Sequence, residues 1–227
     1  MENTTVNQKI LLISNIKSSW LQEILFLCTV VPMGLIGTVL NLMSLSIFVK
    51  KSIREIALFK YLIILSIINS IIAFTQVFLF YFMPNLFYDL ALSFNGRLFI
   101  TFGVNDIIFY FFFLSNLIEI MINIERAIYF SVWFQNFKKI SPYLICCFIL
   151  ILSLIIYIPN FLSLKMVPED LIYVLYRTTM PTDFTLSKIG KITLSISFIL
   201  EGPVIFILLI VTNIIAFISY KRFNKRK

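Results

Sequence analysis

The feature that most constrains the fold is a run of 26 residues without a charged side chain, between Glu23 and Lys50. A helix rises about 1.5 Å per residue, so a run of this length can cross the roughly 30 Å hydrocarbon core of a bilayer. Four more apolar segments follow along the chain. In lipid the backbone must satisfy its own hydrogen bonds, which favours helices. The sequence therefore predicts an all-α, polytopic membrane helix bundle with five transmembrane helices.

Charged residues and prolines set the predicted boundaries. Pro142 lies in the first turn of the fourth span, where helices tolerate proline best. We predict an extracellular tail at residues 1–22 and five spans at residues 23–50, 61–84, 97–130, 142–165 and 190–220. The start of a third cytoplasmic loop follows at residues 221–227.

The composition agrees with a membrane protein. Hydrophobic residues make up 60% of the chain and charged residues 13%, against about 45–50% and 25% in soluble domains. The net charge of +8 comes from basic residues that flank apolar runs, rather than from a shared solvated face. We therefore expect the lipid bilayer, and not nucleic acid, as a partner.

Cysteine and histidine content narrows the possible chemistry. The chain has no histidine, and its three cysteines, Cys28, Cys146 and Cys147, lie within apolar runs. Histidine-based acid–base catalysis and histidine-bearing zinc sites are therefore excluded. The sequence contains no acidic cluster and no nucleophile–base constellation. We expect no metal, no cofactor and no enzymatic activity.

The distribution of Lys and Arg predicts the orientation. Twelve of the 19 basic residues lie on the side of the first and third loops and the carboxyl terminus, and seven on the other side. The positive-inside rule then places the amino terminus outside the cell and the carboxyl terminus in the cytoplasm. Asn3-Thr4-Thr5 is a glycosylation sequon in the predicted extracellular tail.

Polar or small residues recur at helical spacing in three of the spans. The first span carries Gly34, Gly37, Asn41 and Ser44; the second Ser66, Asn69, Ala73 and Gln76; the third Asn116, Glu119, Asn123 and Arg126. Steps of three and four residues place each set on one helix face. Polar and small side chains in lipid turn toward neighbouring helices. The stripes predict a bundle with a polar interior, although any single residue could serve only as interhelical glue.

Two acidic residues within the spans could serve either of two roles. Asp106 lies near the outer end of the third span, and Glu201 lies within the fifth. Intramembrane carboxylates are candidates for function, so both could receive a cationic group of a ligand. Both could equally pair with basic residues at the outer rim, namely Arg97, Lys188 or Lys191.

The inner end of the third span carries Glu125-Arg126, followed by Ala127-Ile128-Tyr129. At this place, with the amino terminus outside, the chain resembles the rhodopsin-like (family 1) G protein-coupled receptors, whose third helix ends in an acid-Arg-aromatic signature. Other family-like positions are Asn41 and Asn69 at their characteristic spacing, Leu65-Ser66 before Asn69, Ser115, Pro159 and Pro203. The resemblance covers essentially the whole chain.

The resemblance implies a plasma-membrane receptor that senses an extracellular small molecule or peptide and signals to a heterotrimeric G protein. It gives Glu125 and Arg126 the role of a coupling switch, in which Glu125 holds Arg126 until activation. Arg126 could instead extend to lipid phosphates as a border anchor. The resemblance also implies an interhelical polar core that contains Asn41, Asn69, Ser115 and Glu119.

The chain departs from the family at several positions. Asn69 replaces an acid, Thr101 stands where a disulfide-forming cysteine is expected, and Ile108 replaces the acid of amine receptors, which favours a non-amine ligand. The family has two more helices than the five found before Lys227, so the resemblance predicts an incomplete receptor chain. The alternative is a polytopic transporter or another non-receptor membrane protein, but no internal repeat supports a transporter.

The predicted orientation can be tested at the sequon. In a eukaryotic cell the protein should shift in gel mobility after glycosidase treatment, because Asn3 would lie in the lumen during synthesis. Asn3→Gln should abolish the shift. An amino-terminal tag that is protected from external protease would show the opposite topology and would remove the basis of the receptor reading.

Overall fold

The structure is a computed structural model that describes residues 26–77, 98, 102, 106–130, 140–166 and 179–225. Asn3, Arg97 and Thr101, named above, lie outside these residues. The described elements in chain order are η1 (Phe26–Val30), α3 (Val31–Phe48), α4 (Lys51–Arg54), α5 (Ala57–Val77), α9 (Phe109–Phe130), α10 (Pro142–Phe161), β1 (Leu164–Met166), β2 (Thr179–Pro181), α12 (Asp183–Leu186), α13 (Lys188–Ile199), η5 (Leu200–Val204) and α14 (Ile205–Asn224).

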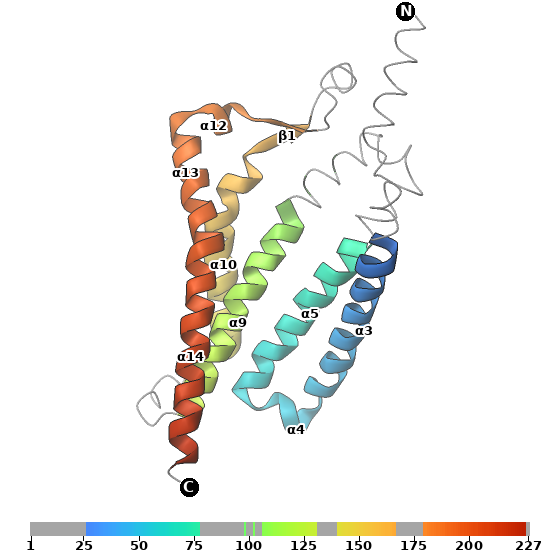
Figure 1. The fold of residues 1–227 in the computed structure, drawn as a ribbon, viewed down its shortest axis with the longest axis vertical. Coiled ribbons are helices and arrows are strands. Elements are labelled where there is room, and N and C mark those ends of the chain that lie inside the picture. Colours follow the sequence, from blue (N-terminus) through green and yellow to red (C-terminus); the bar gives the residue numbers. More distant parts are fainter. Residues whose placement is uncertain are drawn as a thin grey trace, which may run out of the picture.

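Five helical segments are long and apolar enough to cross a membrane, which confirms the predicted helical membrane bundle at this level. They are Cys28–Phe48, Ala57–Val77, Asp106–Phe130, Pro142–Phe161 and Lys188–Asn224. The last combines α13, η5 and α14 into one long helix along the side of the bundle (Figure 1). We call the end that carries α4 and the carboxyl terminus the inner end, and the opposite end the outer end.

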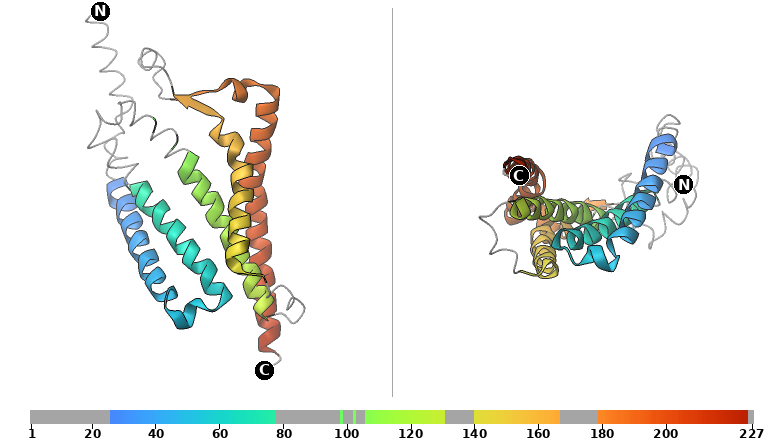
Figure 2. Two further views of the ribbon diagram at one scale, coloured as in Figure 1. Left: turned by 180° about the vertical axis from the view of Figure 1, so that it is seen from behind. Right: turned by 90° about the horizontal axis from the view of Figure 1, so that it is seen from below.

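Helix α9 is the centre of the bundle. It packs against α5, α10 and α14, and the views from behind and from below show it between α5 and α14 (Figure 2). Half of the most apolar stretch of α9 is buried, whereas none of the first span is. The buried core is built mainly of aliphatic and aromatic side chains from α5, α9 and α10, among them Ile68, Phe113, Ile118 and Tyr157. Any site in this bundle is therefore built around α9.

The outer surfaces of the helices are strongly apolar. Phe148 on α10 is 64% exposed, and Phe198 on α13 is 74% exposed. Soluble monomers rarely expose contiguous apolar surface on this scale. Lipid tails cover such surfaces at no cost, so the exposed side chains agree with a bilayer as the surrounding medium.

Helices α3 and α5 meet through small residues. A Cβ atom added at Gly34 would collide with the side chain of Val77 and would lie 3.2 Å from the carbonyl oxygen of Ala73. A Cβ atom added at Gly37 would lie 3.7 Å from the Cβ of Ala73, an ordinary contact. The glycine face of α3 therefore packs on α5, as expected for small residues between membrane helices.

Hydrogen bonds between side chains and neighbouring helices hold the other spans. The Ser115 hydroxyl on α9 donates to Asn69 Oδ1 on α5 at 2.8 Å. The Tyr110 hydroxyl lies 3.1 Å from the Ser153 hydroxyl on α10. The Ser197 hydroxyl on α13 donates to the Ile156 carbonyl oxygen at 2.9 Å. Such bonds contribute about 0.6 kcal/mol each on average in membrane proteins, so they fix register more than they supply stability.

The long final helix widens at Leu200–Val204, which is π-helical. Pro203 lies in this segment. Proline has no N–H to donate and its ring crowds the preceding turn, so the backbone opens into a wider turn. This wider turn carries Glu201.

Two short paired strands, which we call the hairpin, lie at the outer end and follow α10 and precede α12 in the chain. Strands β1 and β2 are antiparallel, with Lys165 opposite Met180. The Thr182 hydroxyl accepts from the Thr185 amide at the start of α12, and the Thr185 hydroxyl donates to the Ser163 carbonyl oxygen at 2.5 Å. These bonds attach the hairpin to the end of α10 and to the start of the fifth span.

The two α3 glycines provide a test of the helix packing. Gly34→Ala should destabilise the protein by about 1–3 kcal/mol, because the new methyl group cannot fit against Val77 and the Ala73 backbone. Gly37→Ala is the matched control, because its methyl group has room and alanine favours a helix. Thermal unfolding in detergent micelles measures both variants. Equal melting temperatures for Gly34→Ala and the parent would show that α3 does not pack on α5 as described.

Candidate functional site

A cavity of about 510 Å³ lies at the inner end, between the beginning of α5 and the end of α9. It is lined by Ile56, Ala57, Leu58, Phe59, Glu125, Arg126, Tyr129 and Phe130. Most of these side chains are apolar, so Glu125 and Arg126 supply its charges. The structure thus places the predicted coupling residues at the wall of a cavity.

Glu125 and Arg126 differ in environment although they are neighbours in sequence. Glu125 is half-buried and Arg126 is exposed. Successive residues on a helix point about 100° apart, which accounts for the difference. The Arg126 guanidinium is therefore accessible at the rim of the cavity.

Tyr61, near the start of α5, is a buried polar residue that the sequence analysis missed. Its side chain is completely buried, and its hydroxyl has no hydrogen-bond partner among the described residues. A tyrosine at the start of an apolar span looks like an interfacial anchor in the sequence, so nothing there distinguished it.

Aromatic rings attach the end of α14 to the inner end of α9. The ring of Phe130 lies 5.4 Å from that of Tyr220 and 5.5 Å from that of Phe223, between centroids. Lys60 on α5 lies 5.6 Å above the ring of Tyr143 on α10. The helices around the cavity are therefore connected to one another at its level.

The structure brings together part of the predicted polar core. Asn69 and Ser115 are hydrogen bonded, as described above. Asn41 is half-buried, and its amide donates to the Gly37 carbonyl oxygen of its own helix at 2.8 Å. The expectation of an interhelical bond from Asn41 is therefore replaced by a bond within α3.

Glu119 does not lie in the interior of the described bundle and corrects the expected polar core. Its side chain is exposed, as are those of Phe112 and Arg126, which are seven residues away on either side. Seven residues make about two helical turns, so the three share one face of α9. Asn123, on the same stripe, is buried, and its Nδ2 has no hydrogen-bond partner.

A second polar cluster lies toward the outer end. Asp106 is 3% exposed, and its Oδ2 has no hydrogen-bond partner. Glu201 is half-buried and accepts a hydrogen bond from Asn160 Nδ2 at 2.6 Å. The side chain of Tyr157 on α10 is buried in the hydrophobic core.

The alternative interpretation pairs these two acids with basic residues at the outer rim. Lys188 and Lys191 are exposed, and within the described ranges neither forms an ion pair with Asp106 or Glu201. Arg97 lies outside the described residues.

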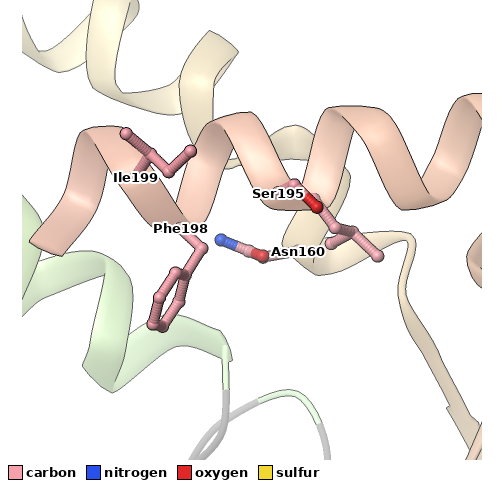
Figure 3. A pocket seen from close by; sticks show the side chains of 5 residues that line it. Asn160, Ser195, Phe198 and Ile199 are labelled. Carbon is pink, nitrogen blue, oxygen red and sulfur yellow. The ribbon is translucent and has the colours of Figure 1, made fainter.

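An open groove of about 470 Å³ adjoins Asn160. It is lined by Asn160, Leu194, Ser195, Phe198 and Ile199. Figure 3 shows the Asn160 amide between the side chains of Phe198 and Ser195, along α13. Asn160 and Tyr157 were missed in the sequence because polar residues near the end of an apolar span are common, and nothing local shows which helix they face.

No group of three or more Cys, Asp or Glu side chains in the described part of the chain could hold a metal ion.

Comparison with known proteins gives no relative: no family model, no curated protein and no solved structure matches the chain.

Proposed function

We propose that the protein is a plasma-membrane receptor of the rhodopsin-like G protein-coupled kind. It senses an extracellular small molecule or peptide and passes the signal to a heterotrimeric G protein through Arg126. It is not an enzyme. The sequence resemblance at Glu125-Arg126 motivates this proposal, and the geometry of the inner end supports it.

One observation carries the proposal: an accessible Arg126 at the rim of a mostly apolar cavity at the inner end, which Glu125 also lines. A guanidinium has five N–H donors and no acceptor, so it binds carboxylates or the free carbonyl groups at the end of a helix. The apolar wall of the cavity would hold the side chains of such a helix. This combination suits a partner that inserts the end of an amphipathic helix from the cytoplasm.

Helix α9 provides a physical connection between the two ends of the molecule. The span Asp106–Phe130 has 25 residues, which is about 37 Å at 1.5 Å per residue. It carries Asp106 of the outer cluster and Arg126 of the inner cavity. Because α9 also packs on α5, α10 and α14, a shift of this helix on ligand binding would alter the cavity wall.

Arg126 provides the first test. In the full-length protein, Arg126→Ala should abolish ligand-driven guanine-nucleotide exchange on the G protein while leaving surface expression detectable, because the side chain is exposed and contributes little to packing. Arg222→Ala removes another basic residue near the end of α14 and should leave exchange near the parent level. Exchange that persists in Arg126→Ala would reduce Arg126 to an anchor at the membrane border.

Glu125 provides the second test. Glu125→Gln should raise basal nucleotide exchange, because it removes the negative charge that would stabilise the resting position of Arg126. Glu55→Gln neutralises an exposed acid at the same end and serves as the control. The measurement is exchange without ligand, normalised to surface expression. Equal basal exchange in Glu125→Gln and the parent would contradict a restraining role for this carboxylate.

A further inference from the structure

The outer cluster has a local backbone feature in common with functional sites. Both of its carboxylates lie in π-helical turns, Asp106 in residues 106–108 and Glu201 in η5. Single π-helical turns inside α-helices occur frequently at functional sites, because they redirect side chains away from the regular helix faces. These two turns lie in the third and fifth spans.

The polar atoms that the groove offers are hydrogen-bond acceptors. The Asn160 Nδ2 already donates to Glu201, which leaves Asn160 Oδ1 as an acceptor. The Ser195 hydroxyl donates to the Lys191 carbonyl oxygen at 2.8 Å, which leaves its oxygen lone pairs. Glu201 does not line the groove but bonds to Asn160, and its carboxylate has a second oxygen. A binding site composed of acceptors is matched by a group that only donates, and ammonium and guanidinium are such groups.

The charge of the cluster also calls for a cation. The Glu201 carboxylate is half-buried and accepts a hydrogen bond from the neutral amide of Asn160. A buried charge is stable only when it is paired or otherwise neutralised. Among the described residues, the ion pair at the outer end joins Lys165 to Asp183, at 3.8 Å, and does not include Glu201.

The groove can also contact the rest of a basic side chain. Leu194 and Ile199 offer apolar surface for the methylene groups of a lysine or arginine. The volume of about 470 Å³ is sufficient for one such side chain.

We propose that Glu201, Asn160 and the adjoining groove bind the cationic side chain of a basic peptide ligand. This inference rests on the proposed receptor function and names the ligand class. The guanidinium or ammonium group bonds to the Glu201 carboxylate and the Asn160 oxygen. The aliphatic part of the side chain lies along α13.

The test uses full-length protein in lipid nanodiscs and three capped amino acids. N-acetyl-argininamide and N-acetyl-lysinamide carry a side-chain cation, and N-acetyl-citrullinamide is the neutral match of the first. At least one cationic probe should raise the thermal unfolding midpoint in a concentration-dependent way, while the citrulline probe should leave it unchanged. Equal stabilisation by the citrulline probe, or none by either cation, would overturn the inference.

Variants locate the binding site. Glu201→Gln should weaken the cationic probe about tenfold or more, the loss expected for one charge-assisted hydrogen bond. Ser195→Ala should weaken it a few-fold, and because Ser195 is exposed this variant remains informative if Glu201→Gln does not fold. Asp183→Asn removes an almost fully exposed acid at the outer end and should bind the probe like the parent. Folded variants of Glu201 and Ser195 with parental affinity would contradict the assignment.

Different results would contradict the receptor function and the ligand class. If nucleotide exchange depends on Arg126 but neither cationic probe binds, only the ligand class is overturned. Binding of a cationic probe that requires Glu201, in a protein whose exchange does not depend on Arg126, would support the site and overturn the coupling role.

Discussion

Hydrocarbon offers no hydrogen-bond partner, so polar groups on the spans need partners within the protein. Many hydroxyls meet this requirement locally by bonding to a carbonyl oxygen one turn earlier. Thr38 donates to Gly34, Ser70 to Ser66 and Thr212 to Leu208, each at 2.8 Å. These residues bring no constraint on neighbouring helices. The few polar groups that are not satisfied locally therefore determine how the helices are arranged, and they also mark the candidate sites.

Those remaining groups gather at two levels of the bundle. At the inner end, Tyr61 on α5 and Asn123 on α9 are buried, and each has a polar atom without a partner among the described residues. Helix α9 also carries Arg126, which lines the cavity. At the outer end, Asp106 is unpartnered and Glu201 relies on Asn160. Between the two levels, Ser115 and Asn69 form a closed pair at the centre. The described polar groups therefore leave unsatisfied atoms toward both ends of the bundle, with a satisfied pair between them.

The helical class and the faces of α3 could be read from the sequence because they follow from local properties. Run length and absence of charge decide whether a segment can span lipid, and helical spacing decides which residues share a face. Gly34 and Gly37 were placed correctly on one face, and that face packs on α5. Glu119 shows the limit of the method. Spacing put it on a stripe with Asn123, but spacing does not say which part of a stripe another helix covers.

The sequence by itself therefore determined five apolar helices, their polar stripes and the position of the Glu125-Arg126 pair at the end of the third span. Only the tertiary structure decided that Asn160 reaches Glu201, that Ser115 bonds to Asn69 and that the Tyr61 side chain is completely buried. The reason is physical. Lipid exerts the same apolar attraction on every helix face, so helix pairing in a membrane depends on close packing and a few polar contacts between residues far apart in the chain. Those contacts have no local signature in the sequence.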